Sequence, residues 1–228
     1  MMAAVVMAAG EGRRLRPLTE RYAKPVLPID GRPVVVTLLH ELRSAGIERV
    51  TVVTGHLAEQ VESLLAGLPF DLRFVRQREV LGSADAVRRA ALEPPYLAIA
   101  ADTVFSPGDV GRFASTIGVD GAIAYRRQPA PGPGRAALRF EDGRITRVVD
   151  NDPANPLAAA PLWLIGPSVH QRLESLTGPP YELAAAFQSA IDAGITILGV
   201  EIGPTRDLTH PADLVANNFP YSAALLAD

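Results

Sequence analysis

A loop near the start of the chain carries the residue types best suited to bind phosphate. In residues 8–16, Ala-Ala-Gly-Glu-Gly-Arg-Arg-Leu-Arg, Gly10 and Gly12 allow the backbone to approach a ligand closely and to present its N–H groups to phosphate oxygens. The loop is not a dinucleotide fingerprint, because Leu15 stands where the third glycine would be, and no Gly-Lys-Ser/Thr of a Walker A loop follows. Alone, the two glycines are equally compatible with an ordinary strand-to-helix turn.

The single lysine of the chain lies close to this loop. Lysines and arginines total 22, yet Lys24 is the only lysine. An arginine guanidinium makes planar, bidentate contacts, whereas the lysine ammonium is a compact point charge on a flexible stem. A chain that uses arginine elsewhere and keeps one lysine here indicates a site that requires the smaller cation. Arg13, Arg14 and Arg16 add further positive charge at this position.

A carboxylate is expected at the same edge of the fold. Asp102 directly follows the apolar run 96–101, which predicts a buried strand. In open α/β sheets, ligands bind at the carboxyl ends of the strands, and a carboxylate there can hold Mg²⁺ against phosphate oxygens. An aspartate that merely ends a strand is the alternative interpretation.

The apolar pattern of the first half predicts the elements that would position these residues. Buried strands are predicted at 3–9, 49–55, 71–77 and 96–102. Amphipathic helices are predicted at 33–46, 58–67 and 83–92. Strands that alternate with helices form βαβ units, and parallel strands buried on both faces are continuously apolar, as these are.

The second half has a different pattern. Further strands are predicted at 121–127, 158–166 and 195–201, and helices at 181–194 and 210–219. Three prolines in 129–134 indicate a loop, and residues 135–150 alternate apolar and polar around Asp142-Gly143, which predicts a hairpin. Because no repeat or linker marks a boundary, residues 1–228 are expected to form one Rossmann-like α/β domain. Its mixed, mostly parallel sheet would carry helices on both faces and a small β-hairpin.

The composition limits the classes of function. A formal net charge of −3 supplies no broad basic field for nucleic acid, and a chain without cysteine has neither disulfides nor thiolate metal ligands. The apolar start lacks the positive flank of a secretory signal and runs directly into the glycine loop, which favours a buried first strand. No apolar run is long enough to span a membrane. We therefore expect a cytoplasmic protein that binds neither nucleic acid nor membranes.

The opening segment resembles that of the sugar-1-phosphate nucleotidylyltransferases, the nucleotide-sugar pyrophosphorylases. The family pattern is a strand, Ala-Ala-Gly-x-Gly-x-Arg, then Pro-Leu-Thr, Pro-Lys-Pro and a Gly-x-Pro that opens a helix. The matching positions are Gly10, Gly12, Arg14, Pro17, Leu18, Thr19, Lys24, Pro25, Gly31 and Pro33. The chain departs at Arg13, where Thr is common, and at Ala23, where Pro is usual. The short members that it resembles are glucose-1-phosphate thymidylyltransferases and N-acetylmuramate-1-phosphate uridylyltransferases.

The resemblance assigns the nucleotide phosphates to the first half, about residues 1–125. Lys24 corresponds to the family's phosphate-binding lysine. Arg14 would stabilise the triphosphate and the departing pyrophosphate, with Arg13 assisting. The nucleotide would also contact the loop at Ala9, Gly10 and Gly12.

A second match implies a base pocket. Gln77 precedes a Leu-Gly-Ser-Ala segment, and by this match Gln77 and the backbone at Gly82 would contact the edge of uracil or thymine. Ser83 belongs to the same pocket and is also expected to be the N-cap of the helix that begins near residue 84. An exposed loop glutamine beside a helix cap is the alternative.

The resemblance also implies a magnesium site and a reaction. Residues 201–218 resemble the family's Trp-x-Asp-x-x-Thr-x-x-Asp-Leu segment, with Thr205 in place of Trp and Asp207 as the second metal-binding carboxylate. Asp102 and Asp207 would hold Mg²⁺, while Asp213 is expected in the first turn of the terminal helix. The implied reaction transfers a nucleoside monophosphate from a nucleoside triphosphate, with UTP or dTTP favoured, to a sugar 1-phosphate.

The second half, about residues 126–228, matches the family's sugar-phosphate site poorly. The family's Glu-Lys-Pro becomes Asn151-Asp152-Pro153, in which Asn151 can contact a hydroxyl but Asp152 cannot replace a phosphate-binding cation. Trp163 would contact the sugar or fill the core, and Glu182 would reach the sugar or stabilise the start of a helix. A hexose 1-phosphate is the first choice of acceptor, followed by an amino sugar, a heptose, phosphocholine or inositol phosphate.

Two other functions stay open. One is a regulatory subunit that binds nucleotide sugars without turnover, and the other is a molybdopterin nucleotidylyltransferase, which shares the first loop. Both predicted metal carboxylates favour an enzyme, and the Pro-Leu-Thr and Leu-Gly-Ser-Ala segments favour the sugar branch. The expected partners are a nucleoside triphosphate and a sugar 1-phosphate, and a homo-oligomer is compatible with the sequence.

Overall fold

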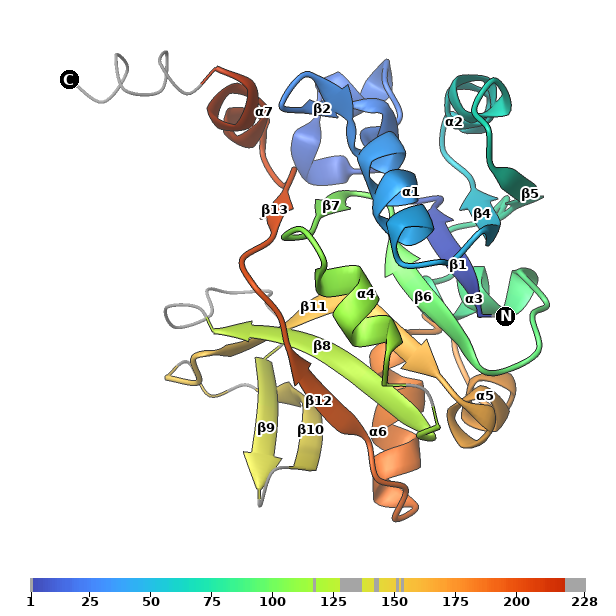
Figure 1. Ribbon diagram of the computed structural model, residues 1–228, viewed down its shortest axis with the longest axis vertical. Coiled ribbons are helices and arrows are strands. Elements are labelled where there is room, and N and C mark those ends of the chain that lie inside the picture. The colour runs from blue at the N-terminus through green and yellow to red at the C-terminus, as the bar shows by residue number, and fades with distance from the viewer. Residues whose placement is uncertain are drawn as a thin grey trace.

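Four parallel strands form the first half of the central sheet. The computed structural model describes residues 2–116, 118–127, 137–141, 144–150, 152 and 154–219. The strands are β1 (Ala3–Ala8), β4 (Arg49–Thr54), β5 (Asp71–Arg76) and β6 (Tyr96–Ala100), and they lie in the order β5-β4-β1-β6. The loops that follow them therefore meet at one edge of the sheet (Figure 1). The four predicted strands are confirmed. β5 is not buried on both faces as predicted, because it is the edge strand and exposes Asp71, Arg73 and Arg76.

One antiparallel strand joins this half to the rest of the sheet. β11 (Leu157–Ile165) pairs antiparallel with β6 on one side and with β8 (Gly121–Arg127) on the other, and β12 (Leu198–Glu201) pairs parallel with β8. Because two antiparallel steps restore the direction, β8 and β12 run the same way as β6. The sheet is thus mixed and mostly parallel, as predicted.

The hairpin of β9 (Ala137–Glu141) and β10 (Arg144–Asp150) joins this sheet at its edge. Its strands pair antiparallel, and Ala137 of β9 lies opposite Ala158 of β11. The predicted hairpin strands are confirmed, while the predicted turn at Asp142-Gly143 and the predicted loop 129–134 lie outside the described residues.

Six helices of the described chain cover the two faces of the sheet. On one face lie α1 (Val34–Ser44), α2 (Ala58–Ala66) and α4 (Asp109–Ala114); on the other lie α3 (Ser83–Arg89), α5 (Pro167–Glu174) and α6 (Leu183–Asp192). In β1, Ala4 and Val6 pack against the first set, and Ala3 and Val5 against the second. Both faces of the strand are covered, which explains its continuously apolar sequence.

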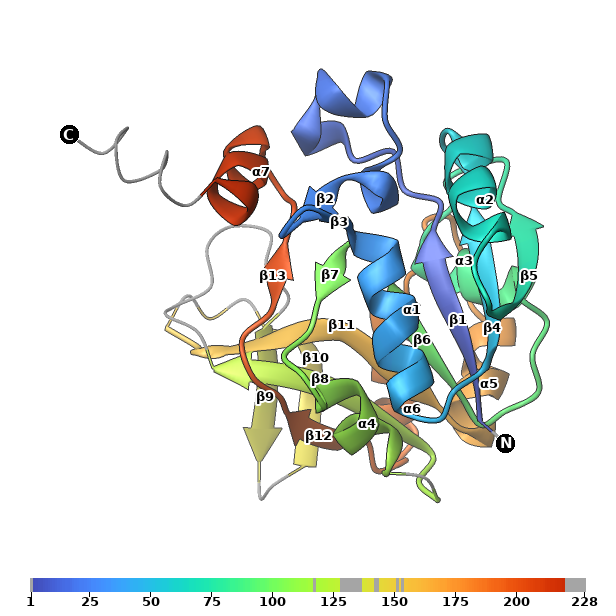
Figure 2. The same ribbon diagram turned by 45° about the horizontal axis from the view of Figure 1, so that its top comes forward.

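Short elements at the carboxyl edge carry the motif residues. After β1 the chain forms single turns of 3₁₀ helix at Arg13–Leu15, Leu18–Glu20 and Lys24–Val26. After β6, β7 (Thr103–Val104) pairs antiparallel with β13 (Arg206–Asp207), so two distant segments lie side by side (Figure 2). A second short pair, β2 (Pro28–Ile29) and β3 (Arg32–Pro33), precedes α1, and α7 (Pro211–Asn218) packs against β2.

The sequence pattern does not predict two of the helices. α4 has only six residues and contains Gly111, and α5 buries only Val169 and Leu173. Neither is long enough, or apolar enough on one face, to produce a clear helical period. The predicted terminal helix is confirmed as α7, with Pro211 at its first position.

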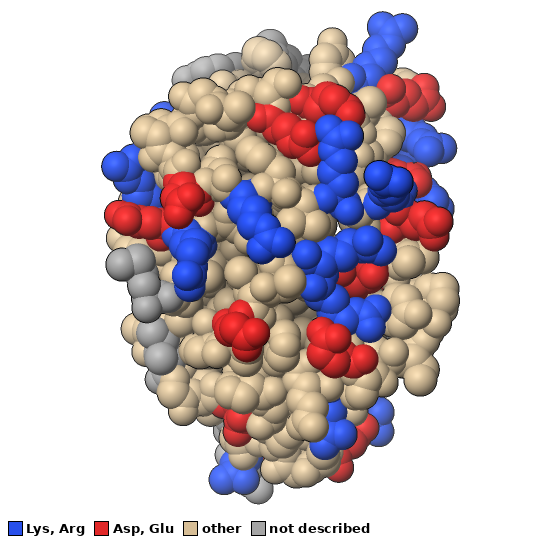
Figure 3. Space-filling model, turned by 90° about the vertical axis from the view of Figure 1, so that its right-hand side faces the viewer, with Lys and Arg blue, Asp and Glu red and all other residues tan. Residues whose placement is uncertain are grey.

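The surface agrees with the balanced composition. On the side where α2 and β5 lie, basic and acidic side chains are interspersed (Figure 3). Arg76 of β5, for example, pairs with Glu62 of α2 at 2.8 Å. In the part of the chain that the structure describes, no helix combines the length and the apolar character that crossing a membrane requires.

Candidate active site

A cavity of about 290 Å³ lies at the carboxyl edge of β1 and β6. The predicted site residues that line it are Gly10, Gly12, Arg13, Arg14, Lys24 and Asp102. The structure therefore brings the glycine loop, the lysine and the first carboxylate together, as expected for the carboxyl ends of neighbouring parallel strands.

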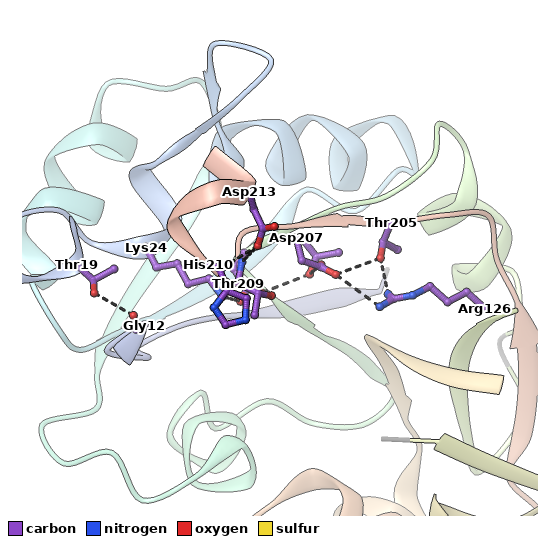
Figure 4. Close-up of polar contacts among 11 residues, drawn as sticks. Gly12, Thr19, Lys24, Arg126, Thr205, Asp207, Thr209, His210 and Asp213 are labelled. Carbon is purple, nitrogen blue, oxygen red and sulfur yellow. Dashed lines mark hydrogen bonds and ion pairs between the residues drawn. The ribbon is translucent and has the colours of Figure 1, made fainter. Parts of the chain in front are cut away.

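The conformation of the first loop depends on Gly12. Its φ is +62°, and a Cβ at this position would lie 2.9 Å from Thr19 Cγ2 and 3.3 Å from Lys24 Cβ. Both the backbone conformation and the close approach require glycine here. The Thr19 hydroxyl donates to the Gly12 carbonyl oxygen at 2.9 Å (Figure 4). The Pro-Leu-Thr segment thus holds the glycine loop against Lys24.

The loop is also supported by the segment after β4. The Ala9 carbonyl oxygen accepts a hydrogen bond from the His56 N–H at 3.2 Å, and His56 Nε2 lies 2.6 Å from the Thr19 carbonyl oxygen. A Cβ on Gly55 would lie 2.7 Å from the Ala9 carbonyl oxygen. Sequence reasoning missed this support, because no motif marks Gly55 or His56.

The two arginines of the loop differ in their partners. Arg13 Nε donates to Glu11 Oε2 at 2.7 Å. This hydrogen bond and the attraction of the charges lower the pKa of Glu11 and raise that of Arg13. Arg14 is exposed, lines the cavity, and has no acidic partner among the described residues. Arg14 is therefore the more available of the two for an anionic ligand.

Lys24 and Asp102 form an ion pair inside the cavity. Lys24 Nζ donates to Asp102 Oδ2, and the two side chains are only 15% and 30% exposed. The lysine comes from the loop after β1 and the aspartate from the end of β6, so the pair bridges two neighbouring strands. A phosphate can replace the aspartate as the partner of Lys24, and a metal ion can replace the lysine as the partner of Asp102.

Asp207 lies next to Asp102 because β13 pairs with β7. In this register Asp207 faces Thr103. The buried Thr103 hydroxyl donates to Asp207 Oδ1 at 2.6 Å and lies 3.3 Å from Asp102 Oδ1. Two carboxylates suit Mg²⁺, which is commonly bound by one or two carboxylates together with substrate phosphates and water. The residues present fit this ion, although the described residues contain no cluster of three or more His, Cys, Asp or Glu for a metal.

Sequence reasoning also missed a cation beside Asp207. Arg126, in β8, has a side chain only 12% exposed. Its Nη2 lies 3.6 Å from Asp207 Oδ2, and its Nη1 donates to the Thr205 hydroxyl (Figure 4). A signal was present, since strand 121–127 ends in two arginines and the alternation of a strand turns only one of them outward. Arg126 thus adds positive charge on the side of the second carboxylate.

Asp213 holds the segment between β13 and α7. Its Oδ2 accepts hydrogen bonds from the N–H groups of Thr209 and His210, at 2.8 and 2.7 Å (Figure 4). The predicted place of Asp213 in the first turn of the terminal helix is confirmed. The contact stabilises the helix start and fixes the chain that follows Asp207.

Gln77 follows β5 and is buried, with 3% of its surface exposed. Its side-chain Nε2 donates to the Gly82 carbonyl oxygen at 3.1 Å and to Asp85 Oδ2 at 2.7 Å. These contacts exclude the alternative of an exposed loop glutamine. Gly82 has a φ of +114°, and a Cβ there would lie 2.2 Å from the Tyr181 carbonyl oxygen, so glycine is required.

The predicted N-cap role of Ser83 is wrong. α3 begins at Ser83 itself and its N-cap is Gly82. The Ser83 hydroxyl instead donates to Glu182 Oε2 at 2.5 Å and accepts a hydrogen bond from the Leu183 N–H at 2.9 Å. It therefore satisfies the first N–H of α6, because the close approach of Gly82 to Tyr181 brings the starts of the two helices together.

The predicted acceptor residues are not brought together in one place. Trp163 of β11 is 9% exposed and packs against Phe187 of α6 with ring centroids 5.0 Å apart. Of the two predicted roles of Trp163, this favours filling the core over contacting the sugar. Glu182 is the N-cap residue of α6, and its carboxylate contacts Ser83. The Asp152 side chain is 47% exposed and lies 4.0 Å from Arg139. Asn151 lies outside the described residues.

The chain is similar to several known proteins. The family model of the MobA-like NTP transferase domain matches residues 4–190. The UTP–glucose-1-phosphate uridylyltransferase AglF of Haloferax volcanii is 27% identical in an alignment of 228 positions that covers 93% of each chain. The bifunctional protein GlmU of Acidovorax ebreus is 37% identical over 166 residues. That match covers 66% of this chain and 33% of GlmU, so the chain matches about a third of that relative's length.

Solved structures agree with the fold. The inositol-1-phosphate CTP transferase from T. maritima superposes with a TM-score of 0.81 at 20% identity. The superposition covers 93% of this chain and 91% of that one. At this level of identity the likeness establishes the architecture of the sheet and helices.

Proposed function

The chain belongs to the MobA-like NTP transferase domain family, and we propose that it transfers a nucleoside monophosphate from a nucleoside triphosphate to a sugar 1-phosphate. The products are a nucleoside-diphosphate sugar and pyrophosphate. One observation carries the proposal: a single cavity holds the glycine loop, Lys24 and Asp102, and Thr103 joins Asp102 to Asp207. Two carboxylates, several cations and a loop of backbone N–H groups form a site for phosphoryl-type chemistry.

The reaction requires positioning and charge neutralisation more than proton transfer. An oxygen of the acceptor phosphate attacks the α-phosphorus in line. A new P–O bond forms as the bond from the α-phosphorus to the bridging oxygen breaks, and pyrophosphate leaves with the electron pair. The nucleophile is already an anion, so no general base is needed.

Each charged residue of the cavity has a role in this proposal. Lys24 would neutralise charge between the α-phosphate and the acceptor phosphate. Arg14, which has no acidic partner among the described residues, would bind the triphosphate and the departing pyrophosphate. Asp102 and Asp207 would hold Mg²⁺, which would supply charge neutralisation at the phosphates.

Arg126 would supply the positive charge that the sequence lacks at position 152. Its guanidinium has five N–H donors in a planar fork, so it can hold Asp207 and a phosphate oxygen at the same time. Its low exposure and its place beside Asp207 support this role. The acceptor phosphate would then lie between Arg126 and Lys24.

We favour UTP or dTTP as donor and a hexose 1-phosphate as acceptor. The relative AglF is a UTP–glucose-1-phosphate uridylyltransferase by its name, and it matches over 93% of both chains. The fold is shared with an inositol-1-phosphate CTP transferase, so non-sugar phosphates such as inositol phosphate and phosphocholine belong in the test.

The decisive test is pyrophosphate release in Mg²⁺ over a grid of substrates. Four ribonucleoside triphosphates and dTTP are each combined with sugar 1-phosphates, inositol phosphate and phosphocholine. Release with one pair, absent from the Lys24→Ala and Asp102→Ala proteins, is the expected result. Nucleotide binding without release across the whole grid would contradict the transferase proposal and favour a regulatory subunit.

A further inference from the structure

The side-chain amide of Gln77 has its orientation fixed by two acceptors. Its Nε2 lies 2.7 Å from Asp85 Oδ2 and 3.1 Å from the Gly82 carbonyl oxygen. A carbonyl oxygen and an ionised carboxylate only accept hydrogen bonds, whereas the amide nitrogen carries two N–H donors. Both N–H groups of Gln77 are therefore used. The reverse orientation would place the amide oxygen against two other oxygens.

Asp85 is itself held in place and kept ionised. It lies in the first turn of α3 and is 7% exposed. Arg89 Nε donates to Asp85 Oδ2 at 2.7 Å, and Arg88 Nη2 lies 4.0 Å from Oδ1. Burial by itself would raise the pKa of Asp85, but the hydrogen bonds from Arg89 and Gln77 lower this pKa below its usual value. α3 thus places a fixed negative acceptor behind Gln77.

We propose that Asp85 is a positioning residue that makes Gln77 an acceptor-only reader of the nucleotide base. The inference rests on the proposed function and on the base pocket that the family resemblance implies at Gln77. Only Oε1 of the amide is left for a ligand, since Asp85 and Gly82 take both N–H groups. A base must then present a donor to this oxygen.

A Gln77 side chain that can only accept a hydrogen bond distinguishes uracil and thymine from cytosine. Uracil and thymine carry an imide N3–H, which can donate to Gln77 Oε1. In the same pose the N3 of cytosine is an acceptor, so it would bring two lone pairs together in a buried place. The N4 amine of cytosine could reach Gln77 Oε1 only if the base shifted in the pocket. The site would therefore prefer imide pyrimidines, and a residue that does not touch the base would set this preference.

The first test uses the wild-type protein and 3-methyl-UTP, in which a methyl group replaces the N3–H. Binding of UTP, 3-methyl-UTP and CTP is measured by calorimetry in Mg²⁺. Because a buried hydrogen bond is lost, the binding affinities of 3-methyl-UTP and CTP are expected to be roughly tenfold to a hundredfold lower than that of UTP. Equal binding of UTP and 3-methyl-UTP would overturn the proposal.

The second test asks whether Asp85 sets the orientation. Arg89 Nε shares Asp85 Oδ2 with Gln77 and would keep an amide oxygen at that place in an asparagine variant, so the substitution is Asp85→Leu. It removes the acceptor behind Gln77 at a similar side-chain size, and the Gln77 amide can then turn and offer an N–H to cytosine N3. The Gly82 carbonyl still disfavours the turn, so we expect the ratio of UTP to CTP affinity to fall by only about three- to tenfold. An unchanged ratio in the folded variant contradicts the role of Asp85.

Asp109 provides a matched control. It is 5% exposed, lies in the first turn of α4, and accepts hydrogen bonds at 2.7 Å from Arg112 and from the Gly203 N–H. Asp109→Leu removes a similarly buried and paired carboxylate that does not contact Gln77. It is expected to lower the melting temperature while leaving the UTP-to-CTP ratio unchanged.

A spectroscopic measurement reports the orientation without any nucleotide. The ¹⁵N–¹H signals of the Gln77 side-chain amide are assigned by their absence in Gln77→Leu. They are expected to shift in Asp85→Leu and not in Asp109→Leu, and the opposite pattern overturns the inference. Wild-type protein that binds no nucleotide at all contradicts the proposed function, whereas binding without N3–H discrimination contradicts only the role of Asp85.

Discussion

The two halves of the molecule assemble their candidate site residues in different ways. In the first half, the predicted Gly12, Lys24 and Asp102 all line one cavity. In the second half, Trp163 packs in the core and Glu182 contacts Ser83 at the start of α6. The residues predicted for the phosphates are gathered in one cavity, while Gln77, Gly82 and Ser83 of the predicted base pocket lie outside its lining, and the predicted acceptor residues are dispersed.

The difference follows from how each half is built. The first loop is one continuous segment between β1 and α1, so its spacing in the sequence is also its spacing around a ligand. In the second half the charged group at the site is Arg126 of β8, which comes within 3.6 Å of Asp207 of β13 although the two strands are far apart in the sequence. A local motif can be recognised from the sequence, but a contact between distant strands is visible only in the fold.

The largest expected effect comes from Lys24. Lys24→Ala should lower kcat/KM for pyrophosphate release on the order of 10²- to 10³-fold, because it removes a preorganised cation at the reacting phosphates. Lys24→Arg is the matched control, and it should restore only part of the activity because the guanidinium is larger and planar. Full activity in Lys24→Arg would show that the single lysine has no special role.

The second effect tests the metal carboxylate that comes from the second half. Asp207→Asn should raise the Mg²⁺ concentration for half-maximal activity roughly tenfold to a hundredfold, as expected when an anionic metal ligand becomes neutral. Asp213→Asn, in the same segment, removes a helix cap and should cost about 1 kcal/mol of stability without changing the Mg²⁺ dependence. Equal shifts in both variants would contradict the assignment of Asp207.

A smaller and more selective effect is expected at Arg126. Arg126→Gln should raise the KM for the acceptor phosphate about tenfold and leave the KM for the nucleoside triphosphate nearly unchanged, since a charged hydrogen bond to the acceptor is lost. Initial rates with each substrate varied in turn separate the two constants. If both rise equally, Arg126 acts only by holding Asp207.

The smallest effect on activity is expected at Trp163. Trp163→Phe should leave kcat/KM within about twofold while lowering the free energy of unfolding by about 1–2 kcal/mol, because it removes buried volume beside Phe187. Urea denaturation and pyrophosphate release measure the two quantities. A large rise in acceptor KM would instead assign Trp163 to the sugar and remove the contrast between the halves.

Periodicity and spacing predict most of the fold and the phosphate side of the site. β1 and β6 are continuously apolar runs, the glycine loop follows β1, and Asp102 lies just past the end of β6. Such features depend on local physics, namely burial on both faces and the free backbone of glycine. These features can therefore be predicted from a single sequence.

The remaining features depend on contacts between distant segments. β7 and β13 have two residues each, too few for any period, yet their pairing places Asp207 beside Thr103 across 104 positions. Ser83 stands where an N-cap is expected, but the fold brings Leu183, 100 positions away, within its reach. Predicting these contacts requires the register of the whole sheet, which single residues do not specify.

The ion pair of Lys24 with Asp102 has a practical consequence. Lys24 carries the only side-chain amine in the protein, and the cavity leaves 15% of that side chain exposed. An acylating reagent can therefore modify one side-chain amine, and mass mapping of the peptide that contains Lys24 separates it from the α-amine of the chain. A ligand that fills the cavity shields this amine whatever the ligand's chemical identity. Occupancy of the site can thus be followed by mass spectrometry before either substrate is known.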